Sequence, residues 1–365
     1  MQQSFTVGVE EEYQIIDPGA RSLKQRAEAI LSRAESSPVN VEAELQLSQV
    51  EIGTPVCDDL AQVRAELVRS RRAVGAAAAE EGMLIGAAGS HPLADPADQA
   101  ITPTERYLGM AEDYGQLARE QIVFGYHVHI GMDDREAAVQ TMNRVRGWLS
   151  PMLALGGSSP FWMGRDTGYS SYRTDVWGRW PMAGSPEVFG SCSEYEEVID
   201  LLVTTESIAE ETRIYWDVRP SSRFDTLEYR VTDVCMSVDE AVMMAGLARA
   251  LTRRCYEQAI RGEPVPVVRP ELLRAAKWRA ARYGLNATLV DVHGQRSRPA
   301  HEVIDDWLGF LRPSLEDNGD WAETSALVHQ TTERGTGAAR QRDAFGRSRR
   351  LEDVVDLIVA ETGAA

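Results

Sequence analysis

The sequence predicts an α+β fold in which helices flank one antiparallel β-sheet. Several short segments alternate strictly between apolar and polar residues, as half-buried strands do, and they lie between segments with helical periodicity. The order of these segments shows no regular strand–helix–strand repeat, so an antiparallel sheet is favoured over a doubly wound parallel one. From Pro270 to the C-terminus we expect helices alone. We therefore predict one domain, residues 1–365, with a sheet-bearing core at 1–262 and a helical region at 263–365 packed on it.

Strands and helices are expected at positions set by periodicity and by chain breakers. Strands are predicted at 5–13, 44–52, 83–88, 124–131, 214–219 and 227–231, the last two joined as a hairpin. Helices are predicted at 23–34, 58–81, 104–120, 133–155, 194–205, 237–262, 300–311 and 351–360. The segment 156–191 is rich in Gly, Ser, Pro, Arg and aromatic residues. A long run of this kind inside a compact domain is typical of a lid or a substrate-binding segment.

The composition is that of a soluble globular protein, and it excludes some partners. Of 365 residues, 43% are hydrophobic and 26% are charged, which is enough for a substantial core. The formal net charge of −18 argues against nucleic acid and acidic membranes as partners, because both require Lys and Arg to neutralise phosphates. A nucleotide stays compatible with this charge, since carboxylates can hold Mg²⁺, which then carries the phosphates.

Targeting and redox features predict a cytoplasmic protein. The N-terminus enters a strand directly, without the basic stretch and apolar run of a signal peptide. No segment reaches the uninterrupted apolar length of a membrane helix. The four cysteines are scattered without CxxC spacing, so we expect reduced thiols and neither a zinc knuckle nor a disulfide scaffold.

Two of the alternating segments carry metal-ligand chemistry on their polar side. In the first strand the apolar residues share one face, and the carboxylates of Glu10 and Glu12 share the other. Like charges on one face repel unless a cation offsets them, which favours a metal site. In the strand at 124–131, His127 and His129 share the polar face. A histidine among aromatic residues is also often a hydrogen-bonded structural residue, so this pair alone does not decide between the two roles.

The predicted hairpin repeats this arrangement with anion-binding residues. Glu228 and Arg230 share the polar face of one strand, and Asp217 and Arg219 share that of the other. A solvent-exposed sheet face also alternates, but it normally favours Lys, Thr, Ser and Gln, and none of the four polar sets contains a lysine. The four segments together predict a sheet face that binds metal ions and phosphate.

Further candidates lie outside these four segments. The strand at 44–52 alternates less cleanly, and we expect it to pass from the core into a cleft that would contain Glu51. Arg165, Arg173 and Arg179 lie in the Gly- and Ser-rich segment and could reach phosphate or carboxylate groups. Surface salt bridges explain each of these arginines, taken singly, about as well.

Absent motifs constrain the chemistry. Neither GxxxxGK[ST] nor GxGxxG between a strand and a helix occurs, so a bound ATP would have to be held by metal ions and arginines. The pair His127 and His129 with a carboxylate could hold zinc, but several glutamates with few histidines favour Mg²⁺ or Mn²⁺. The nucleophile elbow of a Ser-His-Asp hydrolase is missing.

Five separated motifs, in order over the first two thirds of the chain, resemble the carboxylate–amine ligases of the glutamate–cysteine ligase type 2 family. They are 8–12 (GVEEE), 48–56 (SQVEIGTPV), 125–131 (GYHVHIG), the segment 165–173, and 215–220 (YWDVRP) with 226–230 (TLEYR). The resemblance implies a fold like the catalytic domain of glutamine synthetase, in which a curved antiparallel sheet forms a funnel for ATP and divalent metals. It adds little for the helical C-terminal region.

The resemblance also implies roles for the site residues. Carboxylates and one histidine on the polar faces are the implied ligands of Mg²⁺ or Mn²⁺, namely Glu10, Glu12, Glu51, His127 and Glu228. The implied catalytic residues are Arg230, Glu228 and His127, and Arg230 resembles the arginine that steadies the transferred phosphoryl group. Weaker implied contacts to nucleotide or substrate come from Arg165, Arg173, Arg219 and His129.

The implied activity is ATP-dependent amide bond formation by one catalytic domain. A carboxylate does not react with an amine at neutral pH, so the γ-phosphoryl group of ATP would first move to the acid. The amine would then displace it, releasing ADP and phosphate. Glutamate is the expected acid, with cysteine or another amine as acceptor. A guanidino-kinase-like phosphotransferase and a non-catalytic ligand-binding member of the family are the alternatives. Small-molecule acid and amine substrates are therefore the expected partners, without nucleic acid, and a homo-oligomer is left open.

Overall fold

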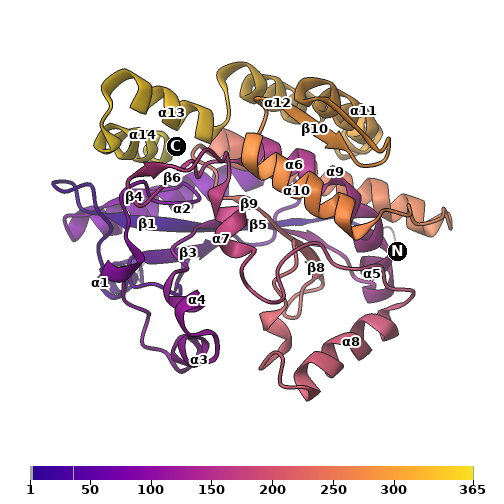
Figure 1. Ribbon diagram of the computed structural model, residues 1–365, viewed down its shortest axis with the longest axis horizontal. Helices are drawn as coiled ribbons and strands as arrows, with labels where there is room; N and C mark the ends of the chain where they lie inside the picture. Colours follow the sequence, from indigo (N-terminus) through magenta and orange to yellow (C-terminus); the bar gives the residue numbers. More distant parts are fainter. Residues whose placement is uncertain (1–2, 36, 365) are drawn as a thin grey trace.

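A seven-stranded antiparallel sheet forms the centre of the protein in a computed structural model that describes residues 3–35 and 37–364 (Figure 1). The strand order is β2-β3-β1-β5-β9-β8, and β4 also pairs with β1. The strands are β1 Val7–Ile16, β2 Asn40–Ala43, β3 Gln49–Gly53, β4 Leu84–Gly86, β5 Gly125–Gly131, β8 Val218–Pro220 and β9 Thr226–Asp233. All of their pairings are antiparallel, including the predicted β8–β9 hairpin. The predicted α+β class is therefore confirmed.

Apolar residues on alternate positions fix which way each strand faces. Val7, Val9, Val128 and Ile130 are buried on β1 and β5, where α2 (Leu60–Glu80) and α9 (Val238–Ile260) pack against the sheet. Burying one such side chain stabilises the fold by about 1.5–3 kcal/mol. A register slip of one residue would turn all of them to the other face. The same constraint therefore holds the polar residues of these strands on the opposite face.

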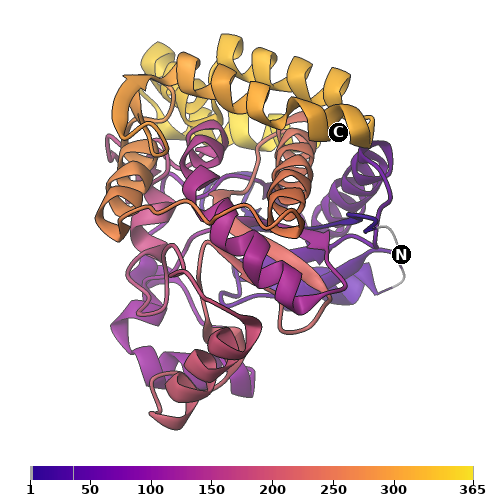
Figure 2. The same ribbon diagram turned by 90° about the vertical axis from the view of Figure 1, so that its right-hand side faces the viewer.

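Helices lie on both sides of the sheet. The C-terminal helices form a layer with α9 above the sheet, whereas α3, α4 and α8 lie below it (Figure 1, Figure 2). The remaining helices are α1 Ala27–Ala34, α3 Glu105–Tyr114, α4 Gln116–Arg119, α5 Arg135–Val145, α6 Leu149–Gly156, α7 Tyr172–Trp177, α8 Cys192–Thr204, α10 Pro270–Tyr283, α11 Ala300–Asn318, α12 Trp321–Arg334, α13 Gly337–Ser348 and α14 Leu351–Gly363. Within the described ranges, no helix combines the length and the apolarity that crossing a membrane requires.

Several predictions about local structure were wrong, among them the strand expected at 214–219, of which only the end lies in β8. The C-terminal region is not purely helical, because β10 (Thr288–Asp291) and β11 (Arg296–Pro299) form a hairpin between helices. The helix expected at 133–155 is divided by a 3₁₀ turn, η2 (Arg146–Trp148), where the chain passes close to that hairpin. A Cβ atom on Gly147 would lie 2.9 Å from the His293 ring, so a larger residue here would displace that ring.

The segment 156–191 is not the structureless run that its composition predicts. It contains β6 (Phe161–Trp162), β7 (Arg165–Asp166) and the helix α7. The buried carboxylate of Asp233 accepts hydrogen bonds from Ser158 N at 2.8 Å, Ser159 Oγ at 2.7 Å and Ser171 Oγ at 2.6 Å. These bonds attach the segment to the end of β9. A freely moving lid would not be fixed to the sheet in this way.

Glu11, between the two candidate ligands of β1, points into the apolar side and is fully buried. Arg71 of α2 donates to both of its oxygens, at 2.6 Å and 3.0 Å, and also to the Met236 carbonyl oxygen at 2.8 Å. Breaking a buried pair by removing one partner costs about 3–5 kcal/mol. Glu11 therefore stabilises the packing of α2 on the sheet and takes no part in the polar face.

Candidate active site

Strand register gathers acidic, histidine and arginine side chains on the polar face of the sheet. Three cross-strand rows result: Glu42 with Glu51 and Glu12, Glu10 with His127, and His129 with Glu228 and Arg219. Side chains on directly opposed positions of neighbouring strands lie within contact distance of one another. The sheet itself, and no mobile loop, therefore sets the positions of these groups.

Glu10 lies between two histidines. Its Oε2 atom is 2.8 Å from His127 Nδ1, and its Oε1 atom is 3.3 Å from His129 Nε2. Burial opposes the charge on Glu10, but its hydrogen bonds to His127 and His129 outweigh that effect and hold its pKa well below the usual range. Burial and the Arg230 guanidinium lower the pKa of His127 to about 4, so its ring is uncharged at neutral pH and can act as a metal ligand.

A β-bulge directs Arg230 toward this cluster. The pairing of β5 with β9 shifts between Tyr126 and Val128, so two residues of β9, one of them Arg230, lie opposite His127. Arg230 Nη1 bonds to Glu228 Oε1, and Arg219 Nε donates to Glu228 Oε2 at 2.8 Å. Burial opposes the charge on Glu228, but these two guanidinium groups hold its pKa far below the usual range. Glu228 is therefore an ionised carboxylate at any physiological pH.

Glu12 lies deeper in the same face. Its Oε2 atom accepts hydrogen bonds from Gln49 Nε2 at 2.8 Å and from the Gly125 amide at 2.7 Å. Burial and the carboxylate of Glu44 raise the pKa of Glu12 to about 7, and Arg173 of α7 partly offsets them. A Cβ atom on Gly125 would lie 2.6 Å from Arg173 Nη2, so glycine at this position admits the guanidinium.

Among the residues that the structure describes, two groups of side chains could hold a metal ion, and both include Glu10. One group is Glu10, Glu51 and His127, and the other is Glu10, His129 and Glu228, with ligand atoms within 4.8 Å of one another in each. The Nε2 atom of His127 is buried without a hydrogen-bond partner among the described residues, as expected of an atom kept for a ligand, and the Nε2 atom of His129 faces only the Glu10 carboxylate at 3.3 Å. Sets dominated by carboxylates suit Mg²⁺ or Mn²⁺. The residues present therefore fit a divalent cation.

Two further carboxylates of this face, those of Glu42 and Glu44, were not predicted from the sequence. Glu44 precedes β3, accepts a hydrogen bond from Tyr107 OH, and has a pKa raised by burial. Glu42 of β2 lies opposite Glu51, whose pKa is raised well above the usual range by burial and by the carboxylates of Glu10 and Glu44. Glu42 and Glu44 are alternate residues of one segment, the same signal that identified Glu10 and Glu12.

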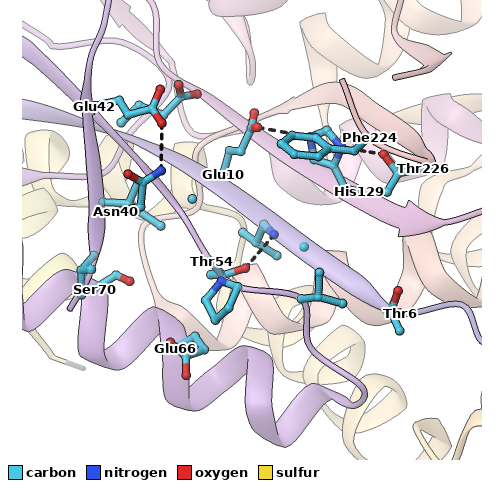
Figure 3. A pocket seen from close by; sticks show the side chains of 18 of the residues that line it. Thr6, Glu10, Asn40, Glu42, Thr54, Glu66, Ser70, His129, Phe224 and Thr226 are labelled. Carbon is cyan, nitrogen blue, oxygen red and sulfur yellow. Dashed lines mark hydrogen bonds and ion pairs between the residues drawn. The ribbon is translucent and has the colours of Figure 1, made fainter. Parts of the chain in front are cut away.

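Two cavities meet at Glu10. The larger, of about 550 Å³, extends from Glu10 and His129 toward Thr54 and the α2 residues Glu66 and Ser70, as Figure 3 shows. The smaller, of about 160 Å³, is lined by Arg230 and by residues from α3 and α7. Residues that line both cavities are Glu10, Glu42, Glu51, His129, Arg223 and Phe224. A molecule in one cavity would thus touch a molecule in the other beside the candidate metal groups.

Aromatic side chains complete the walls, and none of them was predicted. The Phe224 ring packs edge-on against His129 with 5.8 Å between ring centroids. The Trp177 ring lies beneath both Arg173 and Arg230, whose guanidinium carbons are 5.7 Å and 5.6 Å from its centroid. Composition alone could have suggested Trp177, since it belongs to the aromatic-rich segment that also contains Arg173.

The structure brings together many of the predicted residues but not all, since Glu12 and Arg173 line neither cavity and Glu12 belongs to neither candidate metal group. Arg165 is exposed on β7 and lines neither cavity. Arg219 is held by Glu228 and by the Thr212 carbonyl oxygen at 3.2 Å, so it orients Glu228. Arg179 forms an ion pair with Glu120 at 2.6 Å, away from Glu10.

Sequence comparison shows the family of this chain. The sequence profile described as Glutamate-cysteine ligase family 2 matches residues 6–357. The chain belongs to this family. A Frankia alni protein with the provisional name glutamate–cysteine ligase 2-2 is 43% identical over 98% of this chain and 97% of its own length. A Rhodopirellula baltica protein with the provisional name glutamate–cysteine ligase 2 is 39% identical over 98% of this chain and 96% of its own length.

Solved ligase structures share the fold at low sequence identity. The glutamate–cysteine ligase of Francisella tularensis, solved with AMP, aligns over 100% of this chain and 90% of its own, with a TM-score of 0.71 and 12% identity. The bifunctional glutathione synthetase of Pasteurella multocida aligns over 98% of this chain and 52% of its own, with a TM-score of 0.68 and 17% identity. The α+β fold is thus shared with these ligases, the predicted glutamate–cysteine ligase family is confirmed, and the chain is a carbon–nitrogen ligase of that family.

Proposed function

We propose that this ligase uses ATP to join glutamate, as the acid, to a small amine through an acyl phosphate. The observation that carries the proposal is the position of Glu10. It belongs to both candidate metal groups, and it lies where the two cavities meet. Transfer of a phosphoryl group needs positive charge at the point where ATP and the acid come into contact, and the carboxylates at this junction could hold the divalent cation that would supply it.

The two cavities suit different substrates. The larger one has apolar walls that include Ile52 and Pro55, and the Phe224 ring at its edge offers a face for a planar base, so we assign it to the nucleotide. The smaller one combines Arg230 with several carboxylates and suits the acid and the amine. The γ-phosphoryl group and the acid carboxylate would then lie side by side near Glu10, as transfer requires.

The protein groups at the junction have distinct tasks. A divalent cation held by Glu10 with Glu51 and His127, or with His129 and Glu228, would neutralise charge on the phosphate oxygens. Arg230 is held by Glu228 and by the Trp177 ring, so its guanidinium is a fixed positive partner for the transferred group. Tyr107 and Met110 of α3 line the smaller cavity and would help to keep water from the acyl phosphate.

Two comparisons support the choice of substrates. The family description names glutamate and cysteine, which makes glutamate the first acid to test and cysteine one of several amines. The Francisella tularensis structure contains AMP, which supports a nucleotide in this fold.

The test is a screen of amino acids and amines for ADP formation with Mg²⁺, with mass spectrometry to detect new amides. We expect ADP to form only when an acid and an amine are both present, with glutamate among the active acids. Wild-type protein and Glu10→Gln are compared, since the variant should form ADP and amide at least about a hundredfold more slowly. ADP formed with a single substrate that leaves as a stable phosphorylated compound would show a phosphotransferase of the guanidino-kinase type.

A further inference from the structure

A separate cavity lies beside α7, on the side away from Arg173 and Trp177. Its volume is about 470 Å³, and it shares no lining residue with the two cavities that meet at Glu10. The residues of α7 and its C-terminal end that line it are Tyr172, Asp175, Val176 and Arg179. Their spacing of three and four places them on one helix face, whereas Arg173 and Trp177 lie on another. A cavity of this size is typical of small-molecule sites.

Aromatic and apolar residues form the walls of this cavity. The rings of Trp162 and Tyr172 lie 5.6 Å apart between centroids at an angle of 57°, and both are only partly buried. Ile101 and Val176 add aliphatic surface, and Met163 stands 48% exposed beside them. Half-exposed rings of this kind give a planar ligand a face to pack on.

Two exposed charges at this cavity, those of Arg119 and Asp175, have no charged partner, whereas the carboxylate of Asp95, which also forms no ion pair with a described residue, caps the turn at the Ala97 amide at 2.9 Å. Arg119 of α4 donates only from Nε, to Gln116 Oε1 at 3.2 Å, and forms no ion pair with a described residue. The carboxylate of Asp175 takes part in no hydrogen bond or ion pair across the described ranges. By contrast, Arg179 is neutralised by Glu120 at 2.6 Å. The Arg119 guanidinium and the Asp175 carboxylate, beside aromatic walls, are complementary to a ligand that carries a negative charge, a positive charge and a ring.

We propose that this cavity binds an α-amino acid with an aromatic side chain. Its carboxylate would pair with Arg119, its ammonium group with Asp175, and its ring would pack on Trp162 and Tyr172. The site accounts for Trp162 and Tyr172, two aromatic residues of the segment 156–191 that the ligase chemistry leaves unused. Because Arg173 and Trp177 belong to the same helix, the ligand would sit one helix diameter from the candidate active site.

The test measures binding of L-phenylalanine by calorimetry, without ATP or Mg²⁺. We expect saturable binding, with L-alanine and phenethylamine at least about tenfold weaker, since each lacks one recognised group and tenfold corresponds to about 1.4 kcal/mol. Arg119→Ala and Asp175→Asn change exposed side chains and should each weaken binding about tenfold, as should Trp162→Ala. The matched control is Trp278→Ala, which removes a half-exposed tryptophan of α10 outside this cavity and should leave binding unchanged.

A second comparison separates this site from the ligase site. Glu10→Gln should retain L-phenylalanine binding, because Glu10 lines only the other two cavities. The proposal is overturned if L-phenylalanine, L-tyrosine and L-tryptophan all fail to saturate, or if Arg119→Ala binds like Trp278→Ala. It is also overturned if Glu10→Gln abolishes binding while Trp162→Ala retains it, since the amino acid would then occupy the ligase site.

Discussion

Glu10 on β1 and His127 on β5 lie directly opposite each other, with 2.8 Å between the carboxylate and the ring nitrogen. Both residues are held by paired strands of the central sheet, so their separation does not depend on a loop. The same carboxylate reaches toward His129 at 3.3 Å, which places it in both groups of candidate metal ligands.

Glu10→Gln is expected to lower the rate of ADP formation about a hundredfold or more. The amide keeps the size of the side chain but removes a charge at the point where charge develops in the transition state. The apparent affinity for Mg²⁺ should fall as well, which a magnesium titration of the rate measures. Glu112→Gln changes an exposed carboxylate of α3 and serves as the control. Unchanged turnover and unchanged magnesium dependence would remove Glu10 from the metal site.

His127→Ala is expected to reduce turnover far more than His129→Ala. His127 is uncharged at neutral pH, with its pKa lowered to about 4 by burial and Arg230, and it belongs to the group that contains Glu51. His129 has a raised pKa, because its hydrogen bond to Glu10 and the charge of Glu228 outweigh its burial, and is therefore a poorer metal ligand. Steady-state rates of both variants at saturating Mg²⁺ decide the order. A larger loss for His129→Ala would contradict the assignment.

Arg230→Lys is expected to lower turnover about a hundredfold while ATP binding weakens much less. Lysine keeps the charge but cannot contact Glu228 and a phosphoryl group through a planar fork. Loss of a contact that strengthens in the transition state lowers kcat more than it weakens the binding of ATP in the ground state. Calorimetric ATP titration beside rate measurements separates the two effects. Equal loss of both, or no loss of either, would make Arg230 an ordinary ion-pair partner of Glu228.

His91 is expected to make the fold less stable as the pH falls below about 6.5. The ring is fully buried, its Nδ1 accepts the Leu93 amide at 3.2 Å, and burial lowers its pKa from 6.5 to about 3. The unfolded chain therefore takes up the proton first, so the stability is present above pH 6.5 and is lost between pH 6.5 and 3. At pH 5.5 this amounts to about 1.4 kcal/mol of unfolding free energy.

Urea unfolding at pH 7.5 and 5.5 measures this effect. His91→Gln should show a pH-dependent loss about 1.4 kcal/mol smaller than the wild type. His329→Gln replaces an exposed histidine of α12 and should behave like the wild type. The same loss in all three proteins would mean that His91 is protonated as easily in the folded state as in the unfolded state.

Strand alternation predicted the polar face because buried neighbours such as Val9 and Val128 fix the direction of each strand. It could not predict register, which decides that Glu12 lies opposite Glu51 and that Arg219 bonds to Glu228. The sequence pattern also could not predict that the segment 156–191 forms strands and a helix. Its fold depends on hydrogen bonds such as that from Ser159 Oγ to Asp233, which joins residues 74 positions apart.

The most direct test of the proposed ligase reaction follows oxygen from the acid to phosphate. Glutamate, or the acid that the screen identifies, is supplied with ¹⁸O in its carboxylates together with ATP, Mg²⁺ and the amine. If the carboxylate attacks the γ-phosphoryl group, the acid oxygen that bridges to phosphorus leaves with the phosphate when the amine displaces it. The account predicts one ¹⁸O atom in each phosphate released during amide formation. Amide formation with unlabelled phosphate would contradict an acyl phosphate and, with it, the role assigned to the junction at Glu10.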